Sequence, residues 1–595
     1  MTQESQFSLL KQRRFAPFFW VQFLGAFNDN VYKNALVIML AFQVGSLSAQ
    51  ESNTLINLSA GLFILPFFLF SATSGQLADK YEKSRLIRYV VLIELGLMCL
   101  GAFGFYWKSV GLLLFTLFLG GVQSALFGPV KYAFLPQHLE PEEIVGGNGL
   151  VEMGTFVAIL LGTILGGVLI AEEAIGTTLV SVTTIVVAAA GYAMSRFIPN
   201  SPPPAPELRI NWNPITETMR NLRFARGDRT VFLSMLGISW FWFYGATFLA
   251  QFPSYSKEVL GGDESVVTLL LTLFSIGIGT GSLLCERLSG HKVELGLVPF
   301  GSIGLTLFAV DLYFATQGLD AHATVDWLGF LGVDGAVRVV ADLLLIGVFG
   351  GFFIVPLYAL IQLRSEPSHR SRIIAGNNIL NALFMVGSAL FAIVLGQAGV
   401  SVAGVLLATG LLNAAVALYL YTLIPEFLMR FIVWLCIHSL YRIRHQDLSH
   451  IPEQGPGLLV CRQIGARSVF IIAAACRRPV RFLVPERWFR IPILGFVLRA
   501  GRAIVLGSAG GGDPSPAILR ALEAGDLLCW MGECEGAALR ALSERAPVIP
   551  ITIRADAGSS GVLRRLRPRL DLIASPAIRV ADPSIEGDQA KSGER

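Results

Sequence analysis

The chain has 595 residues, of which 53% are hydrophobic and only 15% are charged, and its mean hydropathy is +0.61. Soluble globular domains carry about 25% charged residues, so this composition excludes an ordinary soluble protein and indicates a membrane protein. The formal net charge of +4 is too small and too scattered for a nucleic-acid partner, and the seven cysteines form no C-x-x-C pair, so we expect neither disulfides nor a metal site.

Apolar segments long enough to cross a bilayer, about 20 residues each, recur along the chain as far as residue 425. The first fifteen residues are polar and basic, and the apolar run after them is too long for a signal-peptide core, so we expect the first span to remain as a helix. We predict about twelve spans, at 16–45, 53–76, 86–107, 111–138, 145–171, 176–197, 230–256, 264–286, 295–316, 337–363, 373–398 and 401–424.

Basic residues gather in alternate loops between these spans. They occur at Arg13 and Arg14, between residues 80 and 88, and from Arg196 through the segment 209–229, whereas the intervening loops hold almost none. The positive-inside rule therefore predicts that both termini and the central loop face the cytoplasm.

A Pro-rich polar break, IPNSPPPAPELRINWNP from Ile198 to Pro214, divides the spans six and six. The halves are also alike: the stretch 132–154 aligns with 358–384, matching Tyr132 to Tyr358. A repeat of this kind predicts a transporter with its substrate cavity between two bundles. We expect a first bundle at 1–198, a cytoplasmic linker at 199–229 and a second bundle at 230–425.

The loop after the second span reads GQLADKYEKSR, Gly75 to Arg85, and resembles the signature of the major facilitator superfamily. The resemblance implies an all-α fold of two six-helix bundles. In its gating motif, Gly75 would allow close helix contact, Asp79 would lie near a helix N-terminus, and Lys83 and Arg85 would anchor the cytoplasmic face. In the second half Cys285 stands where Asp79 would fall, so we expect a gating salt bridge on one side only.

Asp29 lies about 22 Å along a helix from Arg14, near the bilayer centre, where an isolated charge costs about 2.5–3.5 kcal/mol. Lys33 follows on the same helical face. The pair could simply neutralise itself among the helices, or it could belong to a polar strip that lines a cavity. We favour the cavity because Gln22, Asn28 and further asparagines add polarity beyond what one pair requires.

Lys131 and Glu152 lie toward the cytoplasmic ends of the fourth and fifth spans, and their counterparts in the repeat are Leu357 and Asn381. Only the first half is charged at these positions, as expected if it holds a polar head while the second half offers an apolar wall, for which the aromatic stretch Ser239–Phe248 is the candidate. Snorkelling to the interface is the alternative for Lys131, and ordinary packing the alternative for the aromatic stretch. The candidate substrate-binding residues are Asp29, Lys33, Lys131, Glu152, Asn28, Gln22 and Asn381.

The segments FAPFFWVQFLGAFNDNVYKNALVI and FGPVKYAFLPQ resemble helices of the bacterial lysophospholipid transporter family, and the resemblance covers Arg14 to Pro425. It implies a multi-pass flippase of the inner membrane that moves lysophospholipids such as lysophosphatidylethanolamine to the cytoplasmic leaflet for reacylation, without a cofactor. It also implies headgroup roles for Asp29 and Lys131. Some members pair the aspartate with an arginine of the seventh span, which is absent here, so Lys33 is the candidate substitute. A drug or small-solute exporter is the alternative.

Beyond Pro425 the segment 426–444 is apolar with basic residues interspersed, which predicts a helix at the membrane surface. A small cytoplasmic α/β domain is expected at 445–580, followed by a disordered tail at 581–595. Four of its segments, between Tyr441 and Ile573, resemble the glycerolipid acyltransferase family.

The family's catalytic block is N-H-x-x-x-x-D, and the resemblance places Gln463 at its histidine and Ser468 at its aspartate. Glutamine cannot accept a proton at neutral pH, so we expect an inactive domain, with Glu533 a degenerate match to the second block. The alternative is a bifunctional transporter and acyltransferase that uses His438, His445 or His450. An inactive domain leaves room for a separate acyltransferase or acyl-ACP synthetase as a partner, and basic residues such as Arg477, Arg478 and Arg481 would serve for contact with membrane lipid.

Overall fold

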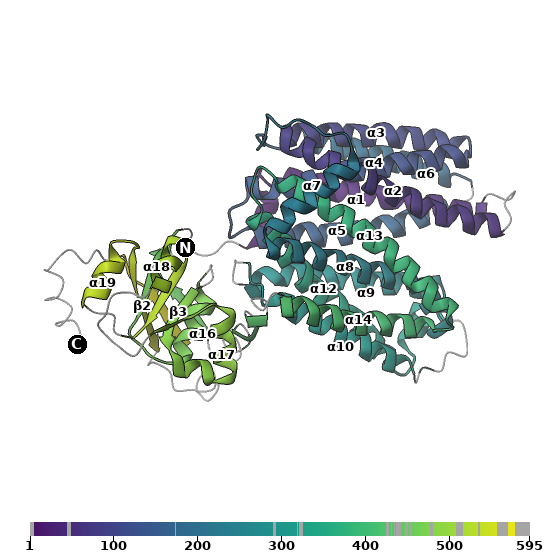
Figure 1. Cartoon of the computed structure of the whole chain (residues 1–595). Coiled ribbons are helices and arrows are strands. Elements are labelled where there is room, and N and C mark those ends of the chain that lie inside the picture. Colours follow the sequence, from purple (N-terminus) through teal and green to yellow (C-terminus); the bar gives the residue numbers. More distant parts are fainter. Residues whose placement is uncertain are drawn as a thin grey trace. The chain divides into compact units, whose positions relative to one another are not determined.

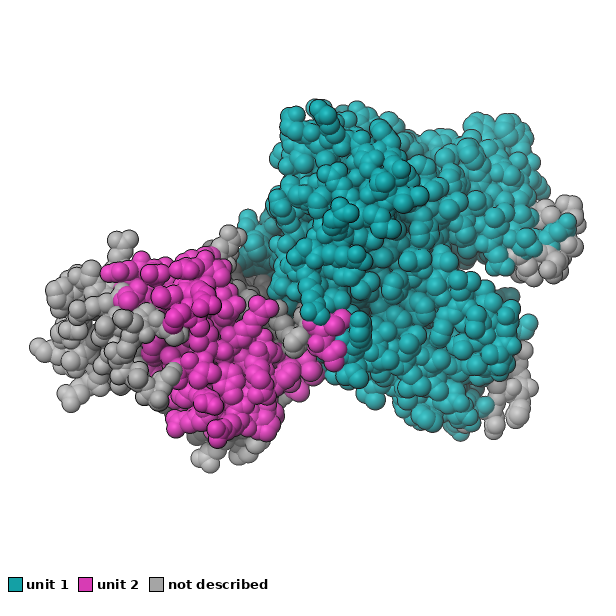
Figure 2. All heavy atoms as spheres, in the orientation of Figure 1, with its two compact units in different colours: residues 1–420 teal, residues 421–595 magenta. Residues whose placement is uncertain are grey.

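The chain divides into two compact units, residues 1–420 and 421–595 (Figure 2). The computed structural model describes residues 5–43, 49–172, 174–289, 293–317, 319, 325–423, 428–429, 431–433, 435, 442–446, 450–452, 455–476, 480–506, 516–532, 536–555 and 569–577.

In the part that the structure describes, the first unit has twelve long helices in two sets of six, which Figure 1 shows as two groups. The first half contains α1 (Ala16–Ile38), α2 (Ala49–Lys80), α3 (Lys83–Tyr106), α4 (Val110–His138), α5 (Ile144–Ile170) and α6 (Gly176–Ser195). The second half contains α8 (Arg229–Ser254), α9 (Glu264–Ser289), α10 (Leu297–Thr316), α12 (Ala336–Arg364), α13 (Arg370–Gln397) and α14 (Val402–Leu423). Short elements are η1 (Gln6–Lys11), η2 (Met39–Gln43), η3 (Tyr255–Val259) and α11 (Trp327–Leu331).

Within the described residues, eleven helices are long and apolar enough to cross a membrane. The remaining long helix is α1, which has 23 residues and carries Asp29 and Lys33 in its interior. The expected twelve-helix architecture is thereby confirmed, and its one polar member is the helix that the sequence singles out.

The segment between the halves is ordered and contains a further helix, α7 (Pro214–Gly227). The side chain of Asn213 accepts hydrogen bonds from the first backbone amides of α7, which is a common way to begin a helix. Gln76 of α2 exchanges two hydrogen bonds with the backbone of Asn211, at 2.7 and 2.9 Å. The linker therefore lies against the end of α2 that carries the Gly75 motif.

The second unit is built on a seven-stranded sheet in the order β1-β7-β6-β2-β5-β3-β4. Its strands are β1 (Arg442–Gln446), β2 (Gly457–Cys461), β3 (Val480–Pro485), β4 (Ile504–Leu506), β5 (Leu527–Met531), β6 (Val548–Ala555) and β7 (Arg569–Ala574). Neighbouring strands are parallel except β6 and β7. The other elements are α16 (Ala466–Ala475), η5 (Glu486–Arg490), α17 (Pro492–Ala500), α18 (Pro516–Glu523) and α19 (Gly536–Ser543).

Helices cover both faces of this sheet (Figure 1). Alternate strand residues point to opposite faces, so Leu459 and Cys529 pack with α16 and α17, whereas Leu458 and Leu528 pack with α18 and α19. Parallel strands buried on both faces read as continuous apolar runs, as in GLLVC of β2. The expected α/β class of the C-terminal domain is confirmed.

The predicted membrane-surface helix at 426–444 is only partly described, and its position at a membrane stays a prediction. Met429 and Val433 are buried in the hydrophobic cluster that also holds α16 and α17. They lie four residues apart and thus on one helical face, which suits packing against a core. Leu435 is exposed, and the predicted tail at 581–595 lies outside the described residues.

Candidate functional site

The polar residues of α1 contact helices of the first half. The hydroxyl of Ser124 on α4 donates a hydrogen bond to the Asp29 carboxylate at 2.8 Å. The ammonium group of Lys33 lies 4.3 Å from the ring centroid of Phe63 on α2, a cation–π contact. Both charged side chains are half-buried. Asp29 and Lys33 are thus held by separate partners and stay partly accessible.

A buried carboxylate that sequence reasoning missed lies behind this pair. Glu94 of α3 is only 3% exposed. The amides of Asn28 and Gln123 donate to its two oxygens at 3.1 and 3.2 Å. Asn28 is itself fully buried, so its described contact is with Glu94 and its side chain does not line a cavity as the sequence analysis expected. The missed signal was a lone acid within the apolar run VVLIELGLMC of the third span.

Lys131 points inward. Its side chain is buried, and its ammonium group donates to the Thr155 hydroxyl of α5 at 2.9 Å. That hydroxyl lies 3.0 Å from the side-chain oxygen of Gln22. Lys131, Thr155 and Gln22 therefore link three helices of the first half. Because its charge is bonded inside the bundle, Lys131 does not snorkel to the interface in this conformation.

Glu152 lies at the boundary between the two halves. The Tyr132 hydroxyl donates to its carboxylate at 2.6 Å. The Tyr132 ring stacks on Tyr358 of α12, with 4.2 Å between centroids and 6° between planes. These two tyrosines are the equivalent residues of the sequence repeat, so their contact lies close to the pseudo-twofold axis that relates the halves.

On the other side of this boundary lies Asn381 of α13. Ser239 donates to the Asn381 side chain at 2.8 Å. The neighbouring aromatic stretch packs mainly within its own half, because Trp240, Phe241 and Phe243 are all buried. Trp242 is half-buried, and its ring stacks with that of Phe156 on α5, 6.4 Å away. Of the expected apolar wall, Trp242 is therefore the residue that faces the first half.

The Gly75 motif closes one end of the unit. A β-carbon on Gly75 would lie 2.7 Å from that of Ala375 on α13, so the helices meet where only glycine fits. Asp79 accepts a hydrogen bond from the backbone amide of Ser371, in the first turn of α13, and forms an ion pair with Arg372 at 3.0 Å. Both partners of the ion pair are buried, and the pair joins the first half to the second.

The two cations of the motif have different surroundings. Lys83 is buried, and its backbone amide donates to the carbonyl of Ser201 in the linker. Arg85 is exposed and lies 3.6 Å from Glu82, one turn away. Arg85 therefore belongs to the surface, and the partner that the sequence motif did not identify is Arg372.

The equivalent contact of α5 with α9 uses glycine. A β-carbon on Gly149 would lie 2.5 Å from the carbonyl oxygen of Ser282. Cys285, the counterpart of Asp79, is buried and uncharged there. We call the end of the unit that holds the Gly75 and Gly149 contacts the closed end. At the opposite end, where α2 begins, Figure 2 shows the two halves apart, and we call it the open end.

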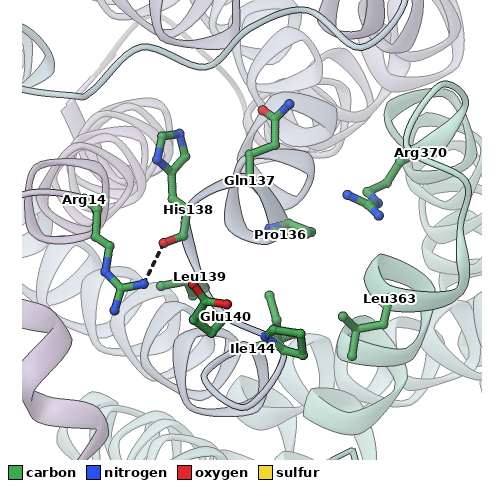
Figure 3. Close-up of a pocket in the computed structure, with 10 residues that line it drawn as sticks. Arg14, Pro136, Gln137, His138, Leu139, Glu140, Ile144, Leu363 and Arg370 are labelled. Carbon is green, nitrogen blue, oxygen red and sulfur yellow. Dashed lines mark hydrogen bonds between the residues drawn. The ribbon is translucent and has the colours of Figure 1, made fainter. Parts of the chain in front are cut away.

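A cavity of about 530 Å³ lies at the closed end, between the α4–α5 connection and the adjoining ends of α12 and α13. Arg14 donates to the His138 carbonyl and pairs with Glu143 on one side, while Arg370 lies on the other (Figure 3). None of the predicted substrate-binding residues lines this cavity, so it is separate from the site formed by Asp29, Lys33, Lys131 and Glu152. Its lining residues are Arg14, Pro136, Gln137, His138, Leu139, Glu140, Pro141, Ile144, Leu363 and Arg370.

In the second unit, the residues that the sequence resemblance places in a catalytic block make structural contacts. The Gln463 amide donates to the carbonyl of Ile553 on β6 at 2.7 Å, and Ser468 is buried in the first turn of α16. Burial raises the pKa of the Cys461 thiol, which makes it a poor nucleophile. His450 is exposed and lies 3.0 Å from the carbonyl of Ala574. Glu533 and His438 lie outside the described residues.

Comparison with known proteins covers the membrane part of the chain. The model of the Major Facilitator Superfamily matches residues 18–341. The lysophospholipid transporter LplT of Serratia proteamaculans is 30% identical over 355 residues, which cover 58% of this chain and 79% of the relative. LplT of Escherichia coli O7:K1 is 31% identical over 355 residues with the same coverage. None of these matches extends over the C-terminal unit.

Solved structures show the same fold at low identity. The human organic anion transporter MFSD10 superposes with a TM-score of 0.54 at 14% identity, over 68% of this chain and 99% of its own. The transporter FucP in its outward conformation gives a TM-score of 0.50 at 11% identity, over 69% and 98%. With two six-helix halves joined at the Gly75 motif and relatives 30–31% identical over four-fifths of their length, the chain belongs to the major facilitator superfamily and, within it, to the lysophospholipid transporter family.

Proposed function

We propose that the protein is a flippase of the inner membrane that moves lysophospholipids, such as lysophosphatidylethanolamine, to the cytoplasmic leaflet. Membership in the lysophospholipid transporter family supports this substrate class. The observation that carries the proposal is the confinement of Asp29, Lys33, Lys131 and Glu152 to one half, opposite Trp242 and Asn381. A lysophospholipid has a zwitterionic or anionic head on one acyl chain, so it needs charges on one wall and apolar surface beside them.

The charges form a sequence from the open end toward the closed end. Lys33 is nearest the open end, and Asp29 lies one turn deeper. Lys131 bonds Thr155, which bonds Gln22, and Gln22 is about 16 Å from Lys33 along α1. Glu152 follows at the boundary between the halves. Lysines bind phosphate and carboxylates bind an amine, so a phosphoethanolamine head finds partners of both signs at each level. The half-buried pair meets the head first, and the buried pair receives it as the halves rearrange.

The closed end faces the cytoplasm in this proposal. Arg14, Lys83, Arg85 and Arg370 lie at that end, and cytoplasmic ends of membrane helices carry an excess of such residues. The described conformation then opens toward the opposite leaflet, from which the substrate enters. Once delivered, the lysophospholipid is reacylated by a separate acyltransferase or acyl-ACP synthetase, because Gln463 leaves the C-terminal domain without the base that acyl transfer needs.

The test is flux of fluorescent lysophosphatidylethanolamine in liposomes that hold the full-length protein. We expect Asp29→Asn and Lys131→Ala each to lower the initial rate at least tenfold while leaving expression and membrane insertion near normal. The matched controls are Asp334→Asn and Lys257→Ala, which remove charges from exposed positions just before α12 and in η3 and should retain the wild-type rate. Wild-type rates in both site variants would remove the physical basis of the assignment. Movement of small solutes instead of the lipid would favour an exporter.

A further inference from the structure

The exposed apolar side chains of the C-terminal domain are unevenly distributed. Among its described residues, the large exposed ones include Ile491 and Ile493, at 46% and 56% exposure, and Val505 of the edge strand β4. No large apolar residue described on α18 or α19 is exposed. The α16–α17 side of the sheet therefore presents apolar surface to its surroundings, and the α18–α19 side does not.

Basic residues accompany these isoleucines. The stretch from 486 to 506 contains four arginines and one acid, Glu486. Arg487 and Arg490 are exposed on η5, and Arg499 is exposed near the end of α17. Leu494 and Leu498, four residues apart, face the core, so Ile493 and Arg499 occupy the outer side of the helix.

The same layer also receives the chain from the membrane. Met429 and Val433 pack in one hydrophobic cluster with Leu494 and Leu498. Met429 comes six positions after Leu423, the last residue of α14, and six extended residues span at most about 22 Å. Since α14 is a candidate membrane span, Met429, which packs on the layer of α16 and α17, lies within that reach of the end of the span.

We propose that the surface formed by Arg487, Arg490, Ile491, Ile493 and Arg499 binds the anionic surface of the bilayer that holds α14. The arginines would contact lipid phosphates, and the two isoleucines would enter the boundary between headgroups and acyl chains. This differs from the lipid contact expected from the sequence, because Arg481 is paired with Asp526 at 3.1 Å and Arg477 and Arg478 lie outside the described residues. The proposal does not depend on which substrate is transported.

The test places a photoreactive benzoylphenylalanine at residue 493 of the full-length protein in nanodiscs that contain phosphatidylglycerol. The matched control carries it at Ala517, an exposed residue of α18 on the other face. We expect phospholipid adducts at 493 at least five times more often than at 517. The yield at 493 should fall at least threefold in R487Q/R490Q/R499Q, and likewise in nanodiscs of phosphatidylcholine alone.

Equal yields at the two positions would overturn the proposal, as would a yield at 493 that is insensitive to both the arginines and the lipid charge. Adducts between residue 493 and a polypeptide, in place of lipid, would identify the surface as a protein interface and overturn it equally. Circular dichroism and gel filtration of each variant establish that the domain is folded, so a lost adduct reports on contact.

Discussion

Charged residues inside a membrane protein are tolerated only where each has a partner, and the charged residues of the first half have partners of several kinds. Asp29 accepts from a serine, Lys33 lies over a phenylalanine ring, and Lys131 donates to a threonine. These neutral partners leave the charge itself in place. A site of this kind can exchange its internal partner for an ionic group of a substrate without first breaking an ion pair.

Glu94 differs, because its two described hydrogen bonds come from buried amides. Replacing it with leucine would leave the Asn28 and Gln123 amides without their acceptor, and each buried unsatisfied group costs about 1–3 kcal/mol. We expect Glu94→Leu to lower the thermal unfolding midpoint of the purified protein clearly, and Glu94→Gln, which keeps an acceptor oxygen, to lower it less. A fluorescence melting curve in detergent measures both. Equal midpoints for the two variants would show that the amides find other partners.

At the scale of helices, the contact of α2 with α13 joins the two halves at the closed end. Gly75 permits the approach, and the buried pair of Asp79 and Arg372 joins the halves. Removing one member of a buried ion pair leaves the other uncompensated, at a cost of about 3–5 kcal/mol to the arrangement that buries it. Removing one of the two charges should therefore destabilise the closed conformation more than exchanging the two residues does.

We expect Gly75→Leu and Asp79→Asn each to shift the population toward conformations open at this end. Spin labels on the ends of α2 and α13, measured by pulsed electron resonance, would report a longer distance in both variants. The exchange Asp79→Arg with Arg372→Asp should restore part of the short-distance population. A glycine-to-alanine change at Gly111, where a β-carbon would have open space, is the matched control and should leave the distribution unchanged.

Prediction from sequence was most accurate at this scale. The predicted spans agree with the long helices to within a few residues at most ends, because a bilayer demands long apolar runs and the loops between them are polar. The partners of the charges were not predictable: Ser124, Glu94 and Arg372 lie far from Asp29, Asn28 and Asp79 along the chain. Such pairings depend on how helices pack, and the 3.6-residue period of one helix carries no information about its neighbour. The burial of Met429 and Val433 was missed for the same reason.

At the scale of the whole molecule, the membrane part is followed by a domain in which Gln463, placed in a catalytic block by the sequence resemblance, makes a structural contact. We expect the full-length protein to show no acyl transfer to lysophosphatidylethanolamine from acyl-CoA or acyl-ACP, because Gln463 cannot act as a base and its amide is bonded to the Ile553 carbonyl. Mass spectrometry of the lipid product measures this. Turnover that disappears in His445→Ala or Glu533→Gln would contradict the expectation and favour the bifunctional alternative.

The five residues between Leu423 and Met429 also determine the effective concentration of the C-terminal domain at the bilayer. A domain confined to that reach of its anchor has an effective concentration at the bilayer on the order of millimolar or above. A surface that binds the bilayer with a millimolar dissociation constant would leave an untethered domain almost entirely in solution. The same affinity would keep the tethered domain on the membrane for much of the time. If the proposed surface has such an affinity, cutting the chain after residue 423 should release the domain from the membrane even though the surface is unchanged.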